Sequence, residues 1–97
     1  MSVLGRYTKQ PAEIETYSIS YNDDLTANDN IVQATASIEP AGLTLDYCTF
    51  IDAVGDHRAR VKLSGGTAGV KYKVTVRATT ADGRVLEDEF FVTIKDY

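Results

Sequence analysis

The chain has 97 residues, 43% of them hydrophobic, with 14 acidic and 10 basic side chains and a net charge of −4. This length predicts one domain with a single modest core, and the ordinary apolar content excludes a disordered chain. The acidic balance argues against nucleic acid as a partner, because phosphate contacts need a basic surface.

Three further features of the sequence indicate the cellular setting of the protein. The single cysteine, Cys48, allows no internal disulfide, which suits a protein made in a reducing cytoplasm. No stretch approaches the ~18 apolar residues of a membrane span. The first six residues lack the apolar core of a signal peptide. We therefore expect no membrane partner.

The chain begins with a mixed leader that has no clear periodicity. Pro11 marks its end, because proline cannot donate a hydrogen bond to a neighbouring strand. We interpret residues 1–12 as an N-terminal arm, packed on its own domain or on a neighbouring subunit, and residues 13–97 as the domain itself. Four residues of the arm are predicted to bind a partner: Val3, Leu4, Arg6 and Tyr7.

Two alternating segments follow, at residues 13–21 and 31–38, and each predicts a strand. In the second, the side chains expected to point inward are Val32, Ala34, Ala36 and Ile38. Between the segments, residues 22–30 are rich in Asp and Asn, whose oxygens suit a hard cation such as calcium. The spacing lacks the glycine and the closing Glu of an EF-hand, so a capped turn is favoured and no metal is predicted.

Residues 43–51 are the most ambiguous segment. Leu45, Tyr47, Thr49 and Ile51 share one phase, whereas Cys48 and Phe50 share the other. Apolar residues in both phases indicate a strand that is partly covered on both faces. We therefore predict that Tyr47 and Phe50 bind a partner, since aromatic residues are favoured at interface cores. Cys48 is interpreted as a small interior or interface hydrophobe.

Residues 58–64 form a clean alternating strand, with Arg58, Arg60 and Lys62 on its outward phase. A second basic row contains Lys71, Lys73 and Arg77, and the acidic side chains are Glu13, Glu15, Glu87, Asp88 and Glu89. These rows are either a solvated face or surfaces where basic and acidic faces of identical copies dock, as in a ring. The glycine-rich residues 65–69 lack the Lys-Ser/Thr of a phosphate loop and join two strands, so they form a plain connection. Thr67 in this connection is a further predicted contact residue.

The last segment, residues 70–97, predicts a β-hairpin. A three-residue loop, 81–83, with Gly83 in the left-handed conformation matches the apolar faces of the two strands. This register pairs Val74 with Phe90, Tyr72 with Val92, Ala78 with Leu86, and Arg77 with Glu87. Asp88 then falls in the inward phase opposite Val76, which predicts a bulge or a position near the rim.

Six or seven strands at intervals of roughly ten residues predict an all-β, immunoglobulin-like antiparallel β-sandwich, with a small barrel as the alternative. The chain has no Trp and one Cys, so it lacks the core signature of antibody domains. His57 follows Asp56, but no nucleophile stands in a recognisable motif. We therefore expect no enzymatic activity, no catalytic residue and no cofactor.

Several segments carry a family resemblance: residues 9–13, 17–21, Leu25, 28–32, 65–69, Tyr72, 74–76 and 79–89. Through them the chain resembles small virion proteins of tailed bacteriophages, described as fibre–tail adaptors or neck proteins with an immunoglobulin-like fold. Members often carry an Asp-Trp pair at the end of the first strand, where this chain has Ser20 and Tyr21. The family has no catalytic residue.

The resemblance implies a virion protein of the tail or neck, present in several copies in a ring. It would hold tail fibres or tailspikes to the tail or head–tail connector by binding portal, tail or neck proteins. Two alternatives stay open: a carbohydrate-binding or adhesive surface module, and a head decoration protein. Deletion of the first ten residues is expected to leave a folded monomer that no longer enters virions.

Overall fold

The computed structural model describes residues 2–21, 29–53 and 56–96, and among them it contains strands, turns and no helix. The all-β prediction is confirmed. No helix in this part of the chain could span a membrane. The strands are β1 (Ser2–Lys9), β2 (Glu15–Ser20), β3 (Ile31–Glu39), β4 (Leu43–Ala53), β5 (Asp56–Gly65), β6 (Lys71–Thr80) and β7 (Val85–Ile94).

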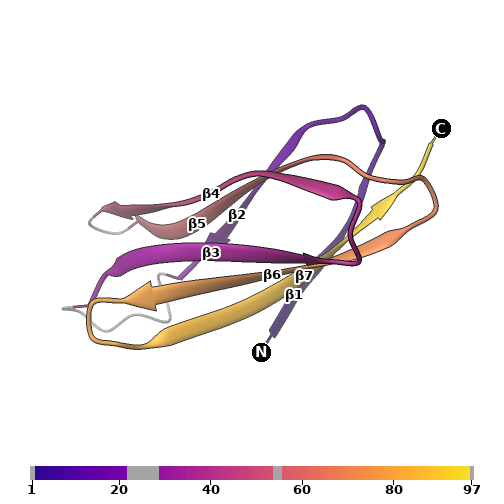
Figure 1. Cartoon of the computed structure of the whole chain (residues 1–97). Helices are drawn as coiled ribbons and strands as arrows, with labels where there is room; N and C mark the ends of the chain where they lie inside the picture. Colours follow the sequence, from indigo (N-terminus) through magenta and orange to yellow (C-terminus); the bar gives the residue numbers. More distant parts are fainter. Residues whose placement is uncertain (1, 22–28, 54–55, 97) are drawn as a thin grey trace.

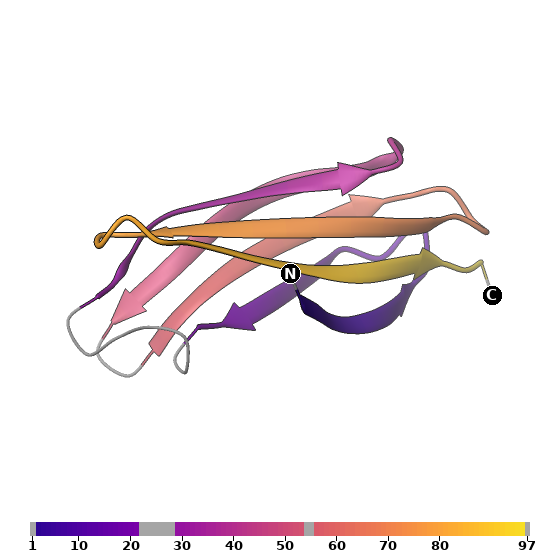
Figure 2. The same ribbon diagram turned by 90° about the horizontal axis from the view of Figure 1, so that it is seen from below.

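The strands form two sheets that lie one over the other (Figures 1 and 2). One sheet has four strands in the order β1-β7-β6-β3, and the other has three in the order β2-β5-β4. The small barrel considered from the sequence is therefore wrong, because the sheets are separate. The chain changes sheets four times, and three of these crossings, the β1–β2, β3–β4 and β5–β6 connections, lie at one end of the sandwich (Figure 1). The fourth lies between β2 and β3.

The leader contributes a strand to the larger sheet. β1 runs parallel to β7, from Ser2 opposite Asp88 to Lys9 opposite Ile94, whereas every other strand pair is antiparallel. The prediction of a wholly antiparallel sandwich is thus corrected at this edge. Because β1 covers the edge of β7, we no longer expect a chain without its first ten residues to keep its full stability.

The predicted hairpin register is confirmed in full. Val74 lies opposite Phe90, Ala78 opposite Leu86 and Arg77 opposite Glu87, and Gly83 has φ of 86°. The bulge expected at Asp88 is absent from the β6–β7 ladder, which is regular throughout. The irregularity lies instead in the β1–β7 ladder, between Val3 and Arg6.

The core lies between the sheets and is built from the alternating positions of each strand. The buried apolar side chains are Ile19, Tyr21, Ile31, Leu43, Ala59, Val61, Leu63, Tyr72, Val74, Val76, Ala78, Phe90, Val92 and Ile94. Ala34, Ala36 and Ile38 pack against this cluster as predicted. Val32 does not: it is 49% exposed, because a register shift between Ile31 and Gln33 makes it the extra residue of a bulge.

A second bulge corrects the phase of β4. The register with β5 shifts between Leu45 and Tyr47, so Asp46 is the extra residue. After Asp46, Cys48 and Phe50 therefore take the core-facing positions of β4, and Tyr47 and Thr49 take the outward positions. Cys48 lies opposite buried Val61 and packs against the core, where burial raises the pKa of its thiol. Tyr47 lies opposite Lys62 on the outer face of the sheet.

Candidate interaction surfaces

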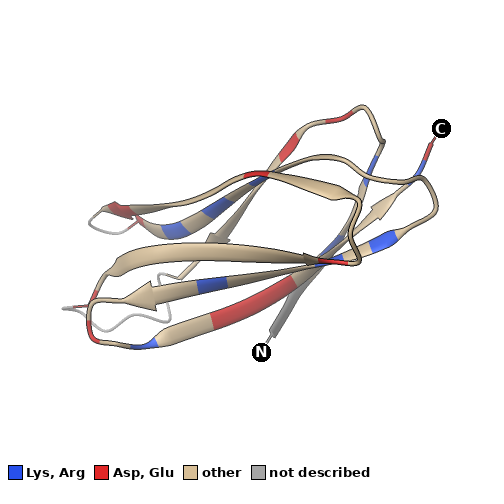
Figure 3. Cartoon of the chain, in the orientation of Figure 1, with Lys and Arg blue, Asp and Glu red and all other residues tan. Residues whose placement is uncertain are grey.

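The predicted basic stripe lies along the centre of the smaller sheet, on the face away from the core. Strand β5 buries Ala59, Val61 and Leu63 completely, so Arg58, Arg60 and Lys62 point outward. Each base has one neighbour on β2 and one on β4. The rows are Thr16–Lys62–Tyr47, Ser18–Arg60–Thr49 and Ser20–Arg58–Ile51. We call these nine residues the β5 face; its central basic row is visible in Figure 3.

The three bases of the β5 face differ in how they are held. Asp56 accepts two hydrogen bonds from Arg58, at 2.9 Å from Nε and 2.8 Å from Nη2. The Nζ of Lys62 lies 5.8 Å from the centre of the Tyr47 ring, in cation–π contact. Among the residues that the structure describes, no carboxylate oxygen lies within 4.0 Å of Arg60 or Lys62. The face therefore presents two bases without an internal counter-charge.

The outer face of the larger sheet is different, because its acidic residues Glu87 and Glu89 have basic partners on β6. Arg77 donates to Glu87 across the β6–β7 ladder, and Lys73 lies 3.9 Å from Glu89. The acidic stretch of β7 that is seen in Figure 3 is thus largely neutralised by the neighbouring strand. This pairing leaves Glu87 and Glu89 less available for docking between identical copies.

The leader residues Arg6 and Tyr7 lie on opposite faces of β1. Arg6 points outward, with its guanidinium carbon 5.6 Å from the centre of the Phe91 ring, and Lys71 approaches the same ring at 4.6 Å. Val3 and Leu4 lie on β1 as well. The Arg6–Phe91 contact is not predictable from the sequence, because parallel pairing brings the two ends of the chain together without a local turn.

Tyr7 packs between the two sheets, against aromatic rings of β2 and β7. Its ring centre lies 5.0 Å from that of Tyr17 on β2 and 5.8 Å from that of Phe90 on β7. Tyr17 and Phe90 are themselves 5.1 Å apart. Burial is the main reason that the pKa of Tyr17 rises to about 12, and the acidic side chains of Glu15 and Glu13 add to it. Tyr7 nevertheless keeps 43% of its surface exposed.

Phe50 and Thr67 lie apart from these residues. Phe50 is opposite buried Ala59 in the core-facing phase of β4, but β4 is an edge strand and leaves the ring 36% exposed. Thr67 lies at the end of the sandwich where the chain crosses between sheets, and its amide donates to the hydroxyl of Tyr72 at 3.0 Å. The predicted contact residues thus lie in several separate regions of the surface rather than in one patch.

A buried lysine, which the sequence did not reveal, fastens that same end. Lys9 is 1% exposed, and its ammonium donates to the carbonyls of Gln10 at 2.8 Å, Pro11 at 3.4 Å and Gly65 at 2.6 Å. Burial lowers its pKa, although the nearby Glu13 and Glu15 act in the opposite direction. Lys9 therefore ties the end of the leader to the glycine-rich connection that carries Thr67.

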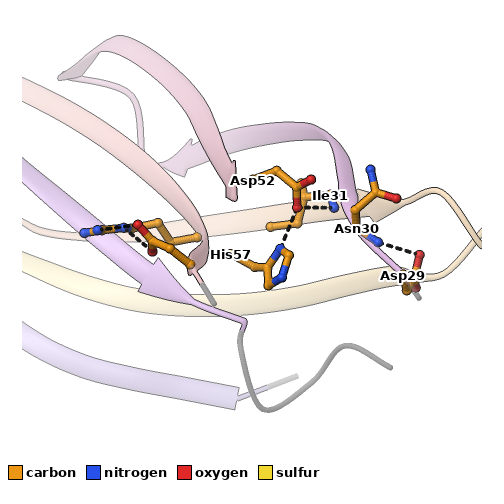
Figure 4. Close-up of polar contacts among 7 residues, drawn as sticks. Asp29, Asn30, Ile31, Asp52 and His57 are labelled. Carbon is orange, nitrogen blue, oxygen red and sulfur yellow. Dashed lines mark hydrogen bonds and ion pairs between the residues drawn. The ribbon is translucent and has the colours of Figure 1, made fainter. Parts of the chain in front are cut away.

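The opposite end of the sandwich is closed by acidic side chains (Figure 4). Asp52 Oδ1 accepts from the amide of Ile31 at 3.1 Å and lies 2.6 Å from His57 Nδ1. The hydrogen bond from His57 is the main cause that lowers the pKa of Asp52. Asp56, the sequence neighbour of His57, binds Arg58 instead, because adjacent residues of a strand point to opposite faces.

Asp29 links the start of β3 to the β6–β7 hairpin at this end. Its Oδ1 accepts from the amides of Asn30 at 2.9 Å and Asp82 at 3.0 Å, and the side chain is 6% exposed. Burial alone would raise the pKa of Asp29, but hydrogen bonds from the Thr80 side chain and these two amides lower it. The remainder of the predicted acidic loop, residues 22–28, lies outside the described residues. Within residues 2–21, 29–53 and 56–96, no three His, Cys, Asp or Glu side chains gather as metal ligands.

The arrangement is a small rigid sandwich with chemically distinct faces and two fastened ends, which is suited to binding other proteins. A family model described as podophage GP4 fiber-tail adaptor protein gp77 matches residues 9–93. The chain belongs to this family. The match begins at Lys9, the last residue of β1, and ends at residue 93 in β7, so it includes every strand pair except β1–β7.

Membership in the fibre–tail adaptor family indicates a structural role in a phage tail rather than a catalytic one. The resemblance noted from the sequence is thereby confirmed. No curated protein sequence matches the chain. The partner-binding residues predicted from the sequence stay predictions, because the family match names no contact.

Proposed function

We propose that this fibre–tail adaptor joins tail fibres or tailspikes to the tail or head–tail connector of a podophage by protein–protein binding. The observation that carries the proposal is the family match over residues 9–93. Polar contacts fasten both ends of the fold, and its two outer faces differ in charge, which is consistent with a linking protein. Several copies in a ring around the tail axis would give each fibre its own attachment point.

We also infer that the sandwich is immunoglobulin-like. In constant-type immunoglobulin domains, strands C, F and G form one sheet and strands A, B, E and D the other. Here β3, β6 and β7 occupy the positions of C, F and G, and β2, β5 and β4 those of B, E and D. The first strand departs from that plan, since β1 joins β7 in the larger sheet. The shared order of six strands supports the inference.

The proposed function is tested by deleting the gene from the phage that encodes the chain and supplying the protein in trans. We expect particles without the protein to carry filled heads and tails but to lose their fibres, and complementation to restore them. Fibres can be counted by electron microscopy and fibre protein by mass spectrometry of purified particles. Particles that keep a normal fibre content without the protein would contradict the adaptor role.

A further inference from the structure

The basic side chains of the β5 face have no role in the packing of the fold. The β5 face is the outer face of the smaller sheet, and none of the described strands covers it. Its central row is basic although the whole chain has a net charge of −4. The hydroxyl side chains of Thr16, Ser18 and Thr49 flank this row and are exposed. The sandwich does not need these bases for its core.

We propose that the β5 face binds a protein surface of the tail or fibre that presents carboxylates at alternate positions of an extended segment. Arg60 and Lys62 are two residues apart on one strand, which separates their Cα atoms by roughly 6.8 Å. Alternate residues of an extended partner have the same spacing, so two carboxylates can meet the two bases. Arginine binds a carboxylate through two parallel hydrogen bonds, and the flanking hydroxyls are further donors.

Tyr47 and Arg58 lie at opposite ends of the proposed binding surface. Tyr47 is 37% exposed beside Lys62, and a tyrosine at the margin of a basic row is a common interface anchor. Arg58 at the other end is already held by Asp56, so it is the base least able to bind a new carboxylate. The structure therefore assigns the binding charge to Arg60 and Lys62.

Charge favours an acidic protein segment over the two other occupants, a second copy and nucleic acid. A second copy would offer Glu87 and Glu89 of β7 only by giving up their pairs with Arg77 and Lys73, and its exposed Glu13 and Glu15 make self-association an outcome that the test below must separate. Nucleic acid would bring a continuous row of phosphates to a chain with a net charge of −4 and only two unpaired bases on this face. A short acidic protein segment matches the face in both extent and charge.

The first test measures binding of a defined probe to the isolated protein. A short acetylated peptide of alternating Glu and Thr is titrated into the isotope-labelled protein, and amide shifts are followed by NMR. We expect shifts confined to the outward residues of β2, β5 and β4, and none with the peptide in which Gln replaces Glu. The double variant Arg60→Glu, Lys62→Glu should bind at least about tenfold more weakly.

The matched control is the double variant Lys71→Glu, Lys73→Glu on the other outer face. Both double variants have the same net charge, so a loss caused by overall charge would affect them equally. Circular dichroism establishes that both are folded. Equal binding by the two variants, or shifts on the larger sheet, would overturn the proposal. Tighter binding of a single-stranded DNA oligonucleotide to the same face, or shifts that depend on protein concentration alone, would replace it with nucleic acid or self-association.

The second test separates this inference from the proposed function on which it rests. Particles are complemented with the wild type, with Arg60→Glu, Lys62→Glu, or with Lys71→Glu, Lys73→Glu. We expect the first and third to carry fibres and the second to lack them or to lack the adaptor itself. If the deletion strain loses its fibres but the Arg60, Lys62 variant restores them, the β5 face is wrong and the adaptor role stands. If the deletion strain keeps its fibres, the adaptor role fails whatever the peptide shows.

Discussion

At the scale of single residues, Gly66 shows how tightly the crossing end is built. It has φ of 100°, and a Cβ at this position would lie 2.7 Å from Cγ1 of Ile94 and 3.3 Å from Cδ1 of Leu43. Gly69 in the same connection has φ of 86° but no atom within 4 Å of such a Cβ. The two glycines thus share the backbone requirement and differ in the space around them.

We predict that Gly66→Ala lowers the free energy of unfolding by about 2–4 kcal/mol, because strain and overpacking add. Gly69→Ala should cost only about 1–2 kcal/mol, because strain acts alone. Urea unfolding followed by circular dichroism measures both. Equal losses in the two variants would show that contact with Ile94 does not limit this turn.

Asp52 makes the other end of the sandwich sensitive to acid. Hydrogen bonds hold the pKa of its carboxyl below the value in the unfolded chain, so its contribution is fully present above about pH 4 and is lost as the pH falls through the folded-state pKa. We predict that Asp52→Asn is less stable than the wild type at pH 7, by about 1–3 kcal/mol, and that the difference shrinks toward pH 3.

Thermal unfolding at pH 7, 5 and 3 checks this prediction. Asp82→Asn is the control, because the Asp82 side chain is exposed and only its backbone amide binds Asp29. A difference between wild type and Asp52→Asn that stays constant down to pH 3 would mean that the carboxylate does not hold Ile31 and His57.

At the scale of elements, β1 decides whether the leader is an arm or part of the domain. Tyr7 joins β1 to both sheets through the rings of Tyr17 and Phe90. We predict that Tyr7→Ala lowers the free energy of unfolding by about 1–3 kcal/mol, whereas Tyr7→Phe, which keeps the ring, changes it little. Urea unfolding of both variants measures these free energies. If Tyr7→Ala unfolds like the wild type, residues 1–12 are a separate arm as the sequence first indicated.

The elements also show which parts of a fold the sequence can predict. The β6–β7 hairpin was predictable because its register depends on a local loop, 81–83, and on apolar phases that meet across it. β1 was not, because its parallel partner lies at the far end of the chain. The bulges at Val32 and Asp46 each shift the phase by one residue, and no glycine or proline marks them.

The candidate surfaces follow the same rule. Arg58, Arg60 and Lys62 were placed correctly on one face, since an unbroken strand alternates strictly. Tyr47 joins them on the outer face only because of the bulge at Asp46, which the sequence pattern does not predict. The burial of Lys9 could not be predicted, because its partners are backbone carbonyls and the pattern of side chains does not indicate them.

At the scale of the whole molecule, the sandwich is about twice as long as it is wide, with extents of 46 × 21 × 18 Å. Its outer faces differ: the larger sheet carries acidic residues paired with bases, and the β5 face carries bases and no acidic residue among its nine described positions. An elongated adaptor with unlike faces can bind one protein on each without the two competing. Membership in the fibre–tail adaptor family gives this geometry its biological setting.

The most direct test of the account is a cryo-electron-microscopy reconstruction of the tail of the phage that encodes this chain. We predict several copies of the two-sheet domain around the tail axis, each between a fibre or tailspike and the tail, with the β5 face against an acidic segment of one of them. Density for the domain only on the capsid, or none between fibre and tail, would contradict the account.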